Sequence, residues 1–168
     1  STLRPMPWLE GTVMVLCDVL DHHTHKEIPH SPRAILKKQI ARLEALGFDA
    51  MMATELEFFL FEQSYDEIRK NGFRDLIPIS GYNEDYHIFQ TTKEEGVMRP
   101  IRNHLFNAGL PIENSKGEAE TGQEELNIRY ADAIACADNH TIAKHAVKEI
   151  AHMQGHAATF MPKWHHDK

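Results

Sequence analysis

The sequence predicts an α+β domain in which a mainly antiparallel sheet has a polar, metal-binding face and helices packed on its other face. Two segments, 51–61 and 124–130, alternate like strands, and each places acidic side chains on one face and apolar side chains on the other. Segments of helical periodicity follow both of them. An antiparallel sheet that packs helices on one face can leave the other face wet.

Length and charge narrow the class of protein. The chain has 168 residues, enough for one domain with a real core. Its net charge is −7 and no basic patch interleaves with aromatic residues, so nucleic acid and anionic membranes are poor partners, whereas divalent cations fit the sign. No apolar run approaches the ~20 residues that span a bilayer. Cys17 and Cys136 are too few for a disulfide framework, so we expect packed, reduced thiols and a cytoplasmic protein.

The first half of the chain is predicted to contain two strands around a helix. Residues 11–20 are apolar enough for a buried strand. Ser31 followed by Pro32 is typical of a helix start, and Gly47 is typical of its end. The strand 51–61 comes next.

The second half begins with a capping-box pattern at 92–95, which predicts a helix through about residue 107 with a kink or split at Pro100. Residues 111–114 predict a short strand and 115–117 a turn. After the strand 124–130, the segment 131–154 predicts a long helix ended by Gly155, and the last strand is expected at about 157–161.

Paired carboxylates are the main chemical signal. Glu55 and Glu57 share one face of a strand about 6–7 Å apart. Two like charges beside an apolar run stay ionised only if water or a cation compensates them. Glu118 and Glu125 come from a second acidic cluster, and together the four are candidate ligands of Mg²⁺ or Mn²⁺. A set of solvated surface acids is the alternative that these residues leave open.

Other residue patterns give weaker indications. His22, His23 and His25 could suggest zinc or nickel, but no Cys lies at ligand spacing, so a solvated loop is favoured. No Walker or dinucleotide glycine loop is present, so a bound nucleotide would need a different device.

Three segments resemble the class I glutamine synthetases. Residues 55–61 resemble the family's Glu-x-Glu-Phe-Phe-Leu-Phe signature, and residues 118–125 resemble its Glu-x-x-x-Gly-Gln-x-Glu segment. Residues 157–163 resemble the segment just upstream of the family's nucleotide-site His. The resemblance implies that residues 1–168 are the N-terminal portion of the catalytic domain, with the β-grasp N-terminal domain and the C-terminal catalytic half absent.

The resemblance also implies an activity, namely ATP-dependent ligation of glutamate with ammonia or an organic amine through a γ-glutamyl phosphate. By position, Glu57, Glu118 and Glu125 would hold the metal that activates the glutamate γ-carboxylate, and Glu118 would take part in catalysis. Glu55 would hold the metal on the nucleotide phosphates. Mg²⁺ or Mn²⁺ is therefore the implied cofactor, with ATP as co-substrate.

Three further residues are matched by position only. Glu113 and Tyr130 match family positions near ATP, although Tyr130 falls on the apolar face in the strand pattern. Tyr86 matches the tyrosine near the ammonium site, with Tyr82 as the competitor.

Residues 114–117 depart from the family, because the class I enzymes usually carry a His-rich stretch there. The departure resembles the paralogues that make γ-glutamyl amides from organic amines. The resemblance further implies a homo-oligomer with inter-subunit active sites and an inactive chain when it is alone. A non-catalytic metal-binding domain, or a relic, is the competing class.

Overall fold

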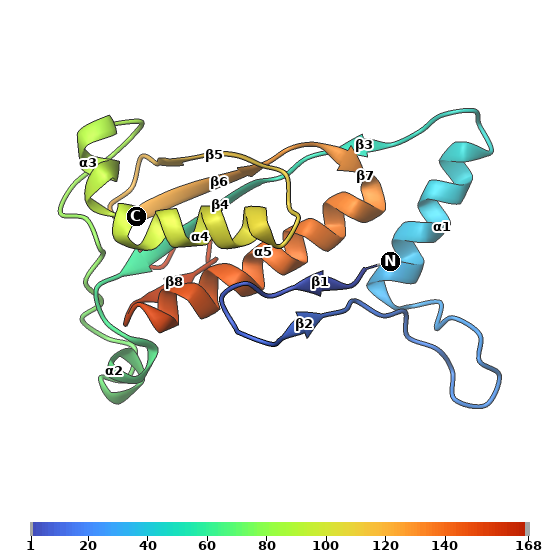
Figure 1. Ribbon diagram of the computed structural model, residues 1–168, viewed down its shortest axis with the longest axis horizontal. Coiled ribbons are helices and arrows are strands. Elements are labelled where there is room, and N and C mark those ends of the chain that lie inside the picture. Colours follow the sequence, from blue (N-terminus) through green and yellow to red (C-terminus); the bar gives the residue numbers. More distant parts are fainter. Residues whose placement is uncertain (1, 167–168) are drawn as a thin grey trace.

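The computed structural model describes residues 2–166 and confirms an antiparallel sheet with helices packed against it (Figure 1). All neighbouring strands of the main sheet run antiparallel. Across the sheet, its strands are β5 (Ile112–Gly117), β6 (Gln123–Ile128), β4 (Glu55–Phe61) and β8 (Ala157–Thr159). Two short pairs lie outside it: β1 (Arg4–Pro5) with β2 (Val13–Met14), and β3 (Met51–Met52) with β7 (Ala131–Asp132).

Helices α4 and α5 cover one face of the sheet. The helices among the described residues are α1 (Pro32–Glu44), α2 (Tyr65–Lys70), α3 (Ile88–Lys93), α4 (Glu95–Asn107) and α5 (Ala133–Met153). The main core joins Leu56 and Phe58 of β4 and Leu126 of β6 to Ile101 of α4 and Val147 of α5. Glu55 and Glu57 are exposed on the opposite face of β4, so the predicted alternation is confirmed. None of the described helices is long and apolar enough to cross a membrane.

The face of β4 that carries Glu55 and Glu57 is only partly exposed to solvent. Phe59 and Phe61 follow Glu57 on the same side of β4 and are buried in a second, smaller core. Ile68 of α2 packs there, and Trp164 contacts both phenylalanine rings edge-on. The carboxylates of β4 therefore stand beside an apolar cluster on their own face.

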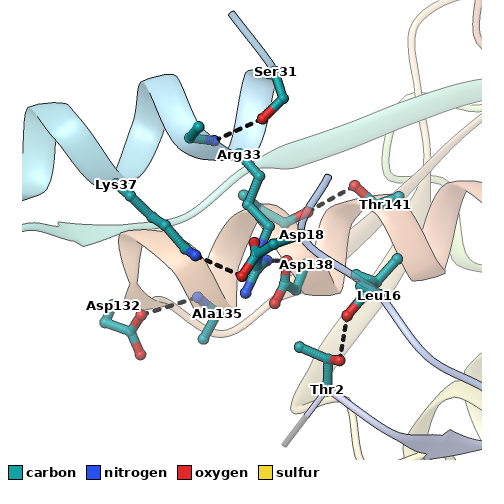
Figure 2. Close-up of polar contacts among 12 residues, drawn as sticks. Thr2, Leu16, Asp18, Ser31, Arg33, Lys37, Asp132, Ala135, Asp138 and Thr141 are labelled. Carbon is teal, nitrogen blue, oxygen red and sulfur yellow. Dashed lines mark hydrogen bonds and ion pairs between the residues drawn. The ribbon is translucent and has the colours of Figure 1, made fainter. Parts of the chain in front are cut away.

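Helix α1 lies outside the buried core, and polar contacts link it to the rest of the chain. It begins as predicted, with the Ser31 hydroxyl accepting a hydrogen bond from the Ala34 N–H at 3.3 Å. None of its side chains is buried. Instead, Arg33 forms ion pairs with Asp18 and with Asp138 of α5, and Lys37 pairs with Asp18 at 2.6 Å (Figure 2).

The predicted buried strand at 11–20 is wrong. Strand β2 covers only Val13–Met14, because β1 is the strand that pairs with it and β1 is equally short. Val13 is 59% exposed and Cys17 is also exposed, so Cys17 is not the packing residue that was expected. The predicted strand at 51–61 is likewise divided, since β3 pairs with β7 whereas β4 belongs to the main sheet.

The predicted capping box at 92–95 is also absent. Helix α3 ends at Lys93, and Glu94 is the N-cap of α4 without a side-chain cap bond. Helix α4 continues through Pro100. The lost backbone hydrogen bond is tolerated because Val97 and Ile101 on either side are buried in the core.

Candidate metal and ligand site

Three carboxylates meet on the polar face of the sheet. Glu57 of β4 lies directly opposite Glu125 of β6, and Glu118 follows the end of β5. One ligand oxygen of each lies within 4.8 Å of the others. We call these residues the three-carboxylate cluster. Metal–oxygen bonds of about 2.0–2.6 Å would let one Mg²⁺, Mn²⁺ or Ca²⁺ ion contact all three with little adjustment.

A tight connection between β5 and β6 brings Glu118 to the cluster. The Glu118 N–H donates to the Gln123 carbonyl at 2.8 Å, which closes the loop. Gly122 has φ of +71° and its N–H donates to the Ser80 hydroxyl at 2.6 Å. A left-handed φ and a close approach to the Leu60 carbonyl both favour glycine at this position.

Lys116 supplies an internal cation to the cluster. Its ammonium donates to Glu125 Oε1 at 2.7 Å and to Asn127 Oδ1 at 2.8 Å. The Asn127 amide donates to the same Glu125 oxygen at 2.6 Å. The Gln123 amide donates to Glu57 Oε2 at 2.6 Å. The oxygens are therefore held in place by donors that a bound cation would have to displace or share.

The pKa values of Glu118 and Glu125 shift in opposite directions. Burial, the hydrogen bond with Glu125 and the charges of Glu125 and Glu57 raise the pKa of Glu118 to about 7. Burial would also raise the pKa of Glu125, but hydrogen bonds from Lys116, Glu118 and Asn127 outweigh it, and the pKa is lowered. Glu118 therefore holds or releases a proton near neutral pH while Glu125 stays ionised.

Glu55 lies on the same face but outside the three-carboxylate cluster. It is opposite Asn127 in the strand register. It lines a hollow of about 250 Å³ together with Glu57, Gln123 and His140. His140 Nδ1 lies 3.1 Å from the Thr54 hydroxyl, and burial lowers the pKa of His140, so its ring is neutral at neutral pH. Glu57 therefore borders both the cluster and this hollow, whereas Glu55 borders the hollow without belonging to the cluster.

Tyr86 is the tyrosine that lies beside the cluster. Its N–H donates to the Gly117 carbonyl at 3.1 Å, and the Lys116 ammonium lies 5.6 Å from its ring centroid. The charge of Glu118 raises the pKa of Tyr86. Tyr82, the competitor, instead contacts the His87 ring. Tyr86 also has φ of +59°, an uncommon conformation outside glycine.

The two residues matched to the nucleotide region are not brought into the cluster. Glu113 is exposed at a bulge of β5, where the register shifts between Ile112 and Asn114. The placement of Tyr130 on the apolar face is wrong, because β6 ends at Ile128 and Tyr130 is 56% exposed beyond it. Arg129 stacks over its ring at 5.7 Å.

The sequence did not indicate Lys116 as a site residue, because the pattern of residues 115–117 predicts a turn. They belong to β5 instead, and Lys116 pairs with Glu125 across the strands. The cross-strand bond from Lys116 to Glu125 and the bond that the Ser115 hydroxyl accepts from Arg102 of α4 at 2.8 Å outweigh the turn propensity of this segment. Asn127 follows Glu125 by two residues in β6, so strand alternation places both side chains on one face, and that spacing is the signal that identifies Asn127.

Gly117 should tolerate no side chain. A Cβ there would lie 2.5 Å from Thr91 Cγ2 and 2.8 Å from Glu84 Cβ. We expect Gly117→Ala to lower the free energy of unfolding by about 1–3 kcal/mol through overpacking. Gly96→Ala is the matched control, since nothing lies within 4 Å of its Cβ in α4, and we expect it to raise stability by about 0.5–1 kcal/mol. Urea unfolding of both variants measures this, and equal effects would contradict the packing described.

Comparison with known proteins identifies the family of the chain. The sequence pattern described as "Glutamine synthetase, catalytic domain" matches residues 29–168. The chain is 40% identical over 164 residues to a gamma-glutamylethanolamide synthetase of Streptomyces coelicolor, covering 98% of this chain and 35% of that enzyme. It is 36% identical over 163 residues to a glutamate–isopropylamine ligase of a Pseudomonas species, covering 97% of this chain and 35% of the ligase.

A solved structure shares the fold. The structure described as apo GmaS without ligand superposes with a TM-score of 0.84 at 28% identity, covering 98% of this chain and 37% of that one. The family match and the shared fold identify the chain as a segment of a glutamine synthetase-type catalytic domain. The chain belongs to the glutamine synthetase family, and it spans about a third of the length of the relatives it matches.

Proposed function

We propose that the protein containing this chain ligates glutamate to an amine, ammonia or an organic amine, at the expense of ATP and through a γ-glutamyl phosphate. The observation that carries the proposal is the three-carboxylate cluster, whose oxygens lie within 4.8 Å of one another. The family membership supports the reaction class, and two of the relatives are named for organic amines. We further propose an organic amine as the preferred acceptor, because residues 114–117 stand where the class I enzymes usually carry a His-rich stretch.

The residues present fit a hard divalent cation. Glu57, Glu118 and Glu125 offer carboxylate oxygens, which Mg²⁺ and Mn²⁺ prefer, and Glu55 would serve a second cation together with groups outside this chain. When bound, such cations neutralise phosphate oxygens and favour phosphoryl transfer to the γ-carboxylate. Gln123 and Asn127 orient the Glu57 and Glu125 carboxylates by hydrogen bonds.

Glu118 is the proposed proton acceptor. An amine attacking an acyl phosphate must lose a proton, and the Glu118 carboxylate is a base that lies close enough to Tyr86 for its charge to raise the pKa of Tyr86. Tyr86 lies beside Glu118 and would form one wall of the amine site, and the cluster's negative charge attracts a protonated amine. Glu113 and Tyr130 remain proposed nucleotide contacts. A homo-oligomer with shared sites and a cytoplasmic location complete the proposal.

An acceptor panel with the protein that contains this chain tests the proposal. Ethanolamine, isopropylamine and ammonia are compared by kcat/KM, with ATP-dependent phosphate release and mass detection of the γ-glutamyl product. We expect an organic amine to exceed ammonia by at least about tenfold, a difference of about 1.4 kcal/mol in transition-state binding. Preference for ammonia would refute the assigned acceptor. Absence of ATP-dependent product with every amine would favour a domain that binds metal without catalysis.

A further inference from the structure

A second group of carboxylates lies on the opposite side of β6 from the three-carboxylate cluster. Glu124 precedes Glu125 in the strand, so the two side chains point to opposite faces. Glu84 comes from the loop before α3, and Glu94 from the junction of α3 and α4. One oxygen of each lies within 4.8 Å of the others. We call Glu84, Glu94 and Glu124 the buried acid triad.

The triad is shut off from solvent and short of donors. Glu84 is 0% exposed, Glu124 1% and Glu94 3%. Both carboxylate oxygens of Glu84, Oε2 of Glu94 and Oε1 of Glu124 are buried and accept no hydrogen bond of normal geometry from the residues that the structure describes. An uncompensated buried carboxylate is among the costliest features a fold can contain.

The basic side chains near the triad are engaged elsewhere. The Lys93 ammonium donates to Gln90 Oε1 at 2.8 Å and lies over the Phe89 ring. Arg102 donates to Glu95 at 2.7 Å and to Ser115. Burial and the charge of Glu84 raise the pKa of Glu94 to about 7. The charge of Lys93 lowers this pKa, but by less than the other two effects raise it. Burial likewise raises the pKa of Glu84, against the opposing Ser80 hydroxyl and Lys93.

We propose that the buried acid triad binds a divalent cation of the hard, oxygen-preferring class, separate from the cations of the three-carboxylate cluster. Three carboxylates supply ligands of the kind that Mg²⁺, Mn²⁺ and Ca²⁺ take. The spacing of the oxygens fits one ion, and the orphaned oxygens of Glu84 point to a missing ligand. Glu94 also lines a surface hollow of about 380 Å³.

A cation there would fasten the segment 84–95 to the sheet. That segment contributes Glu84 and Glu94, whereas Glu124 belongs to β6. Gly117, the residue of β5 opposite Glu124, leaves just enough room for Glu84, since a Cβ at Gly117 would lie 2.9 Å from Glu84 Oε2. Tyr86 lies two residues beyond Glu84, so the same cation would fix the backbone that presents Tyr86 to the three-carboxylate cluster.

Mn²⁺ binding to the chain tests the site directly. Bound Mn²⁺ is counted by electron paramagnetic resonance, and the melting temperature is measured with and without Mn²⁺. The double variant Glu84→Gln/Glu94→Gln removes two triad ligands. Glu57→Gln removes a ligand of the three-carboxylate cluster, and Glu44→Gln on α1 is the matched control. Because glutamine keeps the side-chain shape, the double variant without metal should melt no lower than the wild type, since it lacks the like-charge repulsion.

We expect the double variant to bind one Mn²⁺ fewer than the wild type and to lose several degrees of the Mn²⁺-dependent rise in melting temperature. Glu57→Gln should keep the triad ion and Glu44→Gln should change neither measure. Equal Mn²⁺ counts and equal Mn²⁺-dependent rises in wild type and double variant would overturn the proposal. If the double variant does not fold, anomalous scattering from Mn²⁺-grown crystals decides: a peak among the three triad carboxylates supports the site, and its absence there overturns it.

Discussion

Replacing Glu125 by glutamine should weaken Mn²⁺ binding at the three-carboxylate cluster by roughly 100-fold or more. Loss of an outer partner of a metal ligand already costs 10–100-fold in affinity, and Glu125 is expected to be a direct ligand. The Glu125 carboxylate is almost fully buried, so a water molecule could not readily take its place as a ligand of the metal. Isothermal titration of Mn²⁺ into wild type and variant measures the loss.

Glu57→Gln separates metal ligation from the ion pair that Glu125 forms with Lys116. Glu57 bonds to Gln123 rather than to Lys116, so a comparable loss in Glu57→Gln can be assigned to the missing ligand oxygen. Glu44→Gln on the exposed surface of α1 should leave Mn²⁺ affinity within about twofold of the wild type, as expected for a screened surface charge. If both cluster variants bind like Glu44→Gln, the carboxylates are ordinary surface acids and the assigned ligands are wrong.

Removing the Lys116 ammonium should have two effects of opposite sign. Lys116→Met keeps the aliphatic stem but leaves Glu125 without its charged partner, and we expect the cation-free chain at pH 8 to lose about 1–3 kcal/mol of stability. Mn²⁺ affinity should rise by about tenfold, because the ion no longer competes with a hydrogen bond to a charged group, worth about 1.5–3 kcal/mol. Urea unfolding and Mn²⁺ titration measure the two effects.

Lys70→Met, at an exposed position of α2, is the control for the loss of one positive charge. It should change neither stability nor Mn²⁺ affinity appreciably. A Lys116→Met variant that loses stability and also binds Mn²⁺ more weakly would contradict competition between the ammonium and the metal. It would assign Lys116 a supporting part in the metal site instead.

The sequence was informative where side chains repeat with a period. Alternation in 51–61 and 124–130 predicted the antiparallel pairing and the faces of Leu56, Glu57 and Glu125, all of which the structure confirms. The Ser31 cap was readable because it depends on neighbours in the chain. The strand predicted at residues 11–20 is wrong because apolar character makes a strand only where a partner strand is available.

Long-range contacts explain what the sequence did not reveal. Lys116 reaches the cluster because β5 continues to Gly117, and that extension depends on pairing with β6 rather than on local propensity. The buried acid triad joins Glu124 of β6 to Glu84 and Glu94, which come from an earlier segment of the chain. One signal was available: Glu124 falls on the apolar face of its strand with Leu126 and Ile128, an unusual place for an acid.

The adjacent acids Glu124 and Glu125 also bear on how faithfully the chain can fold. A slip of β6 by one residue would exchange the two, and each face of the strand would still present a carboxylate. The acids therefore contribute little to choosing the correct alignment. Leu126 and Ile128 would turn to the solvent in the slipped arrangement, so these two apolar side chains must carry the discrimination against misfolded pairings.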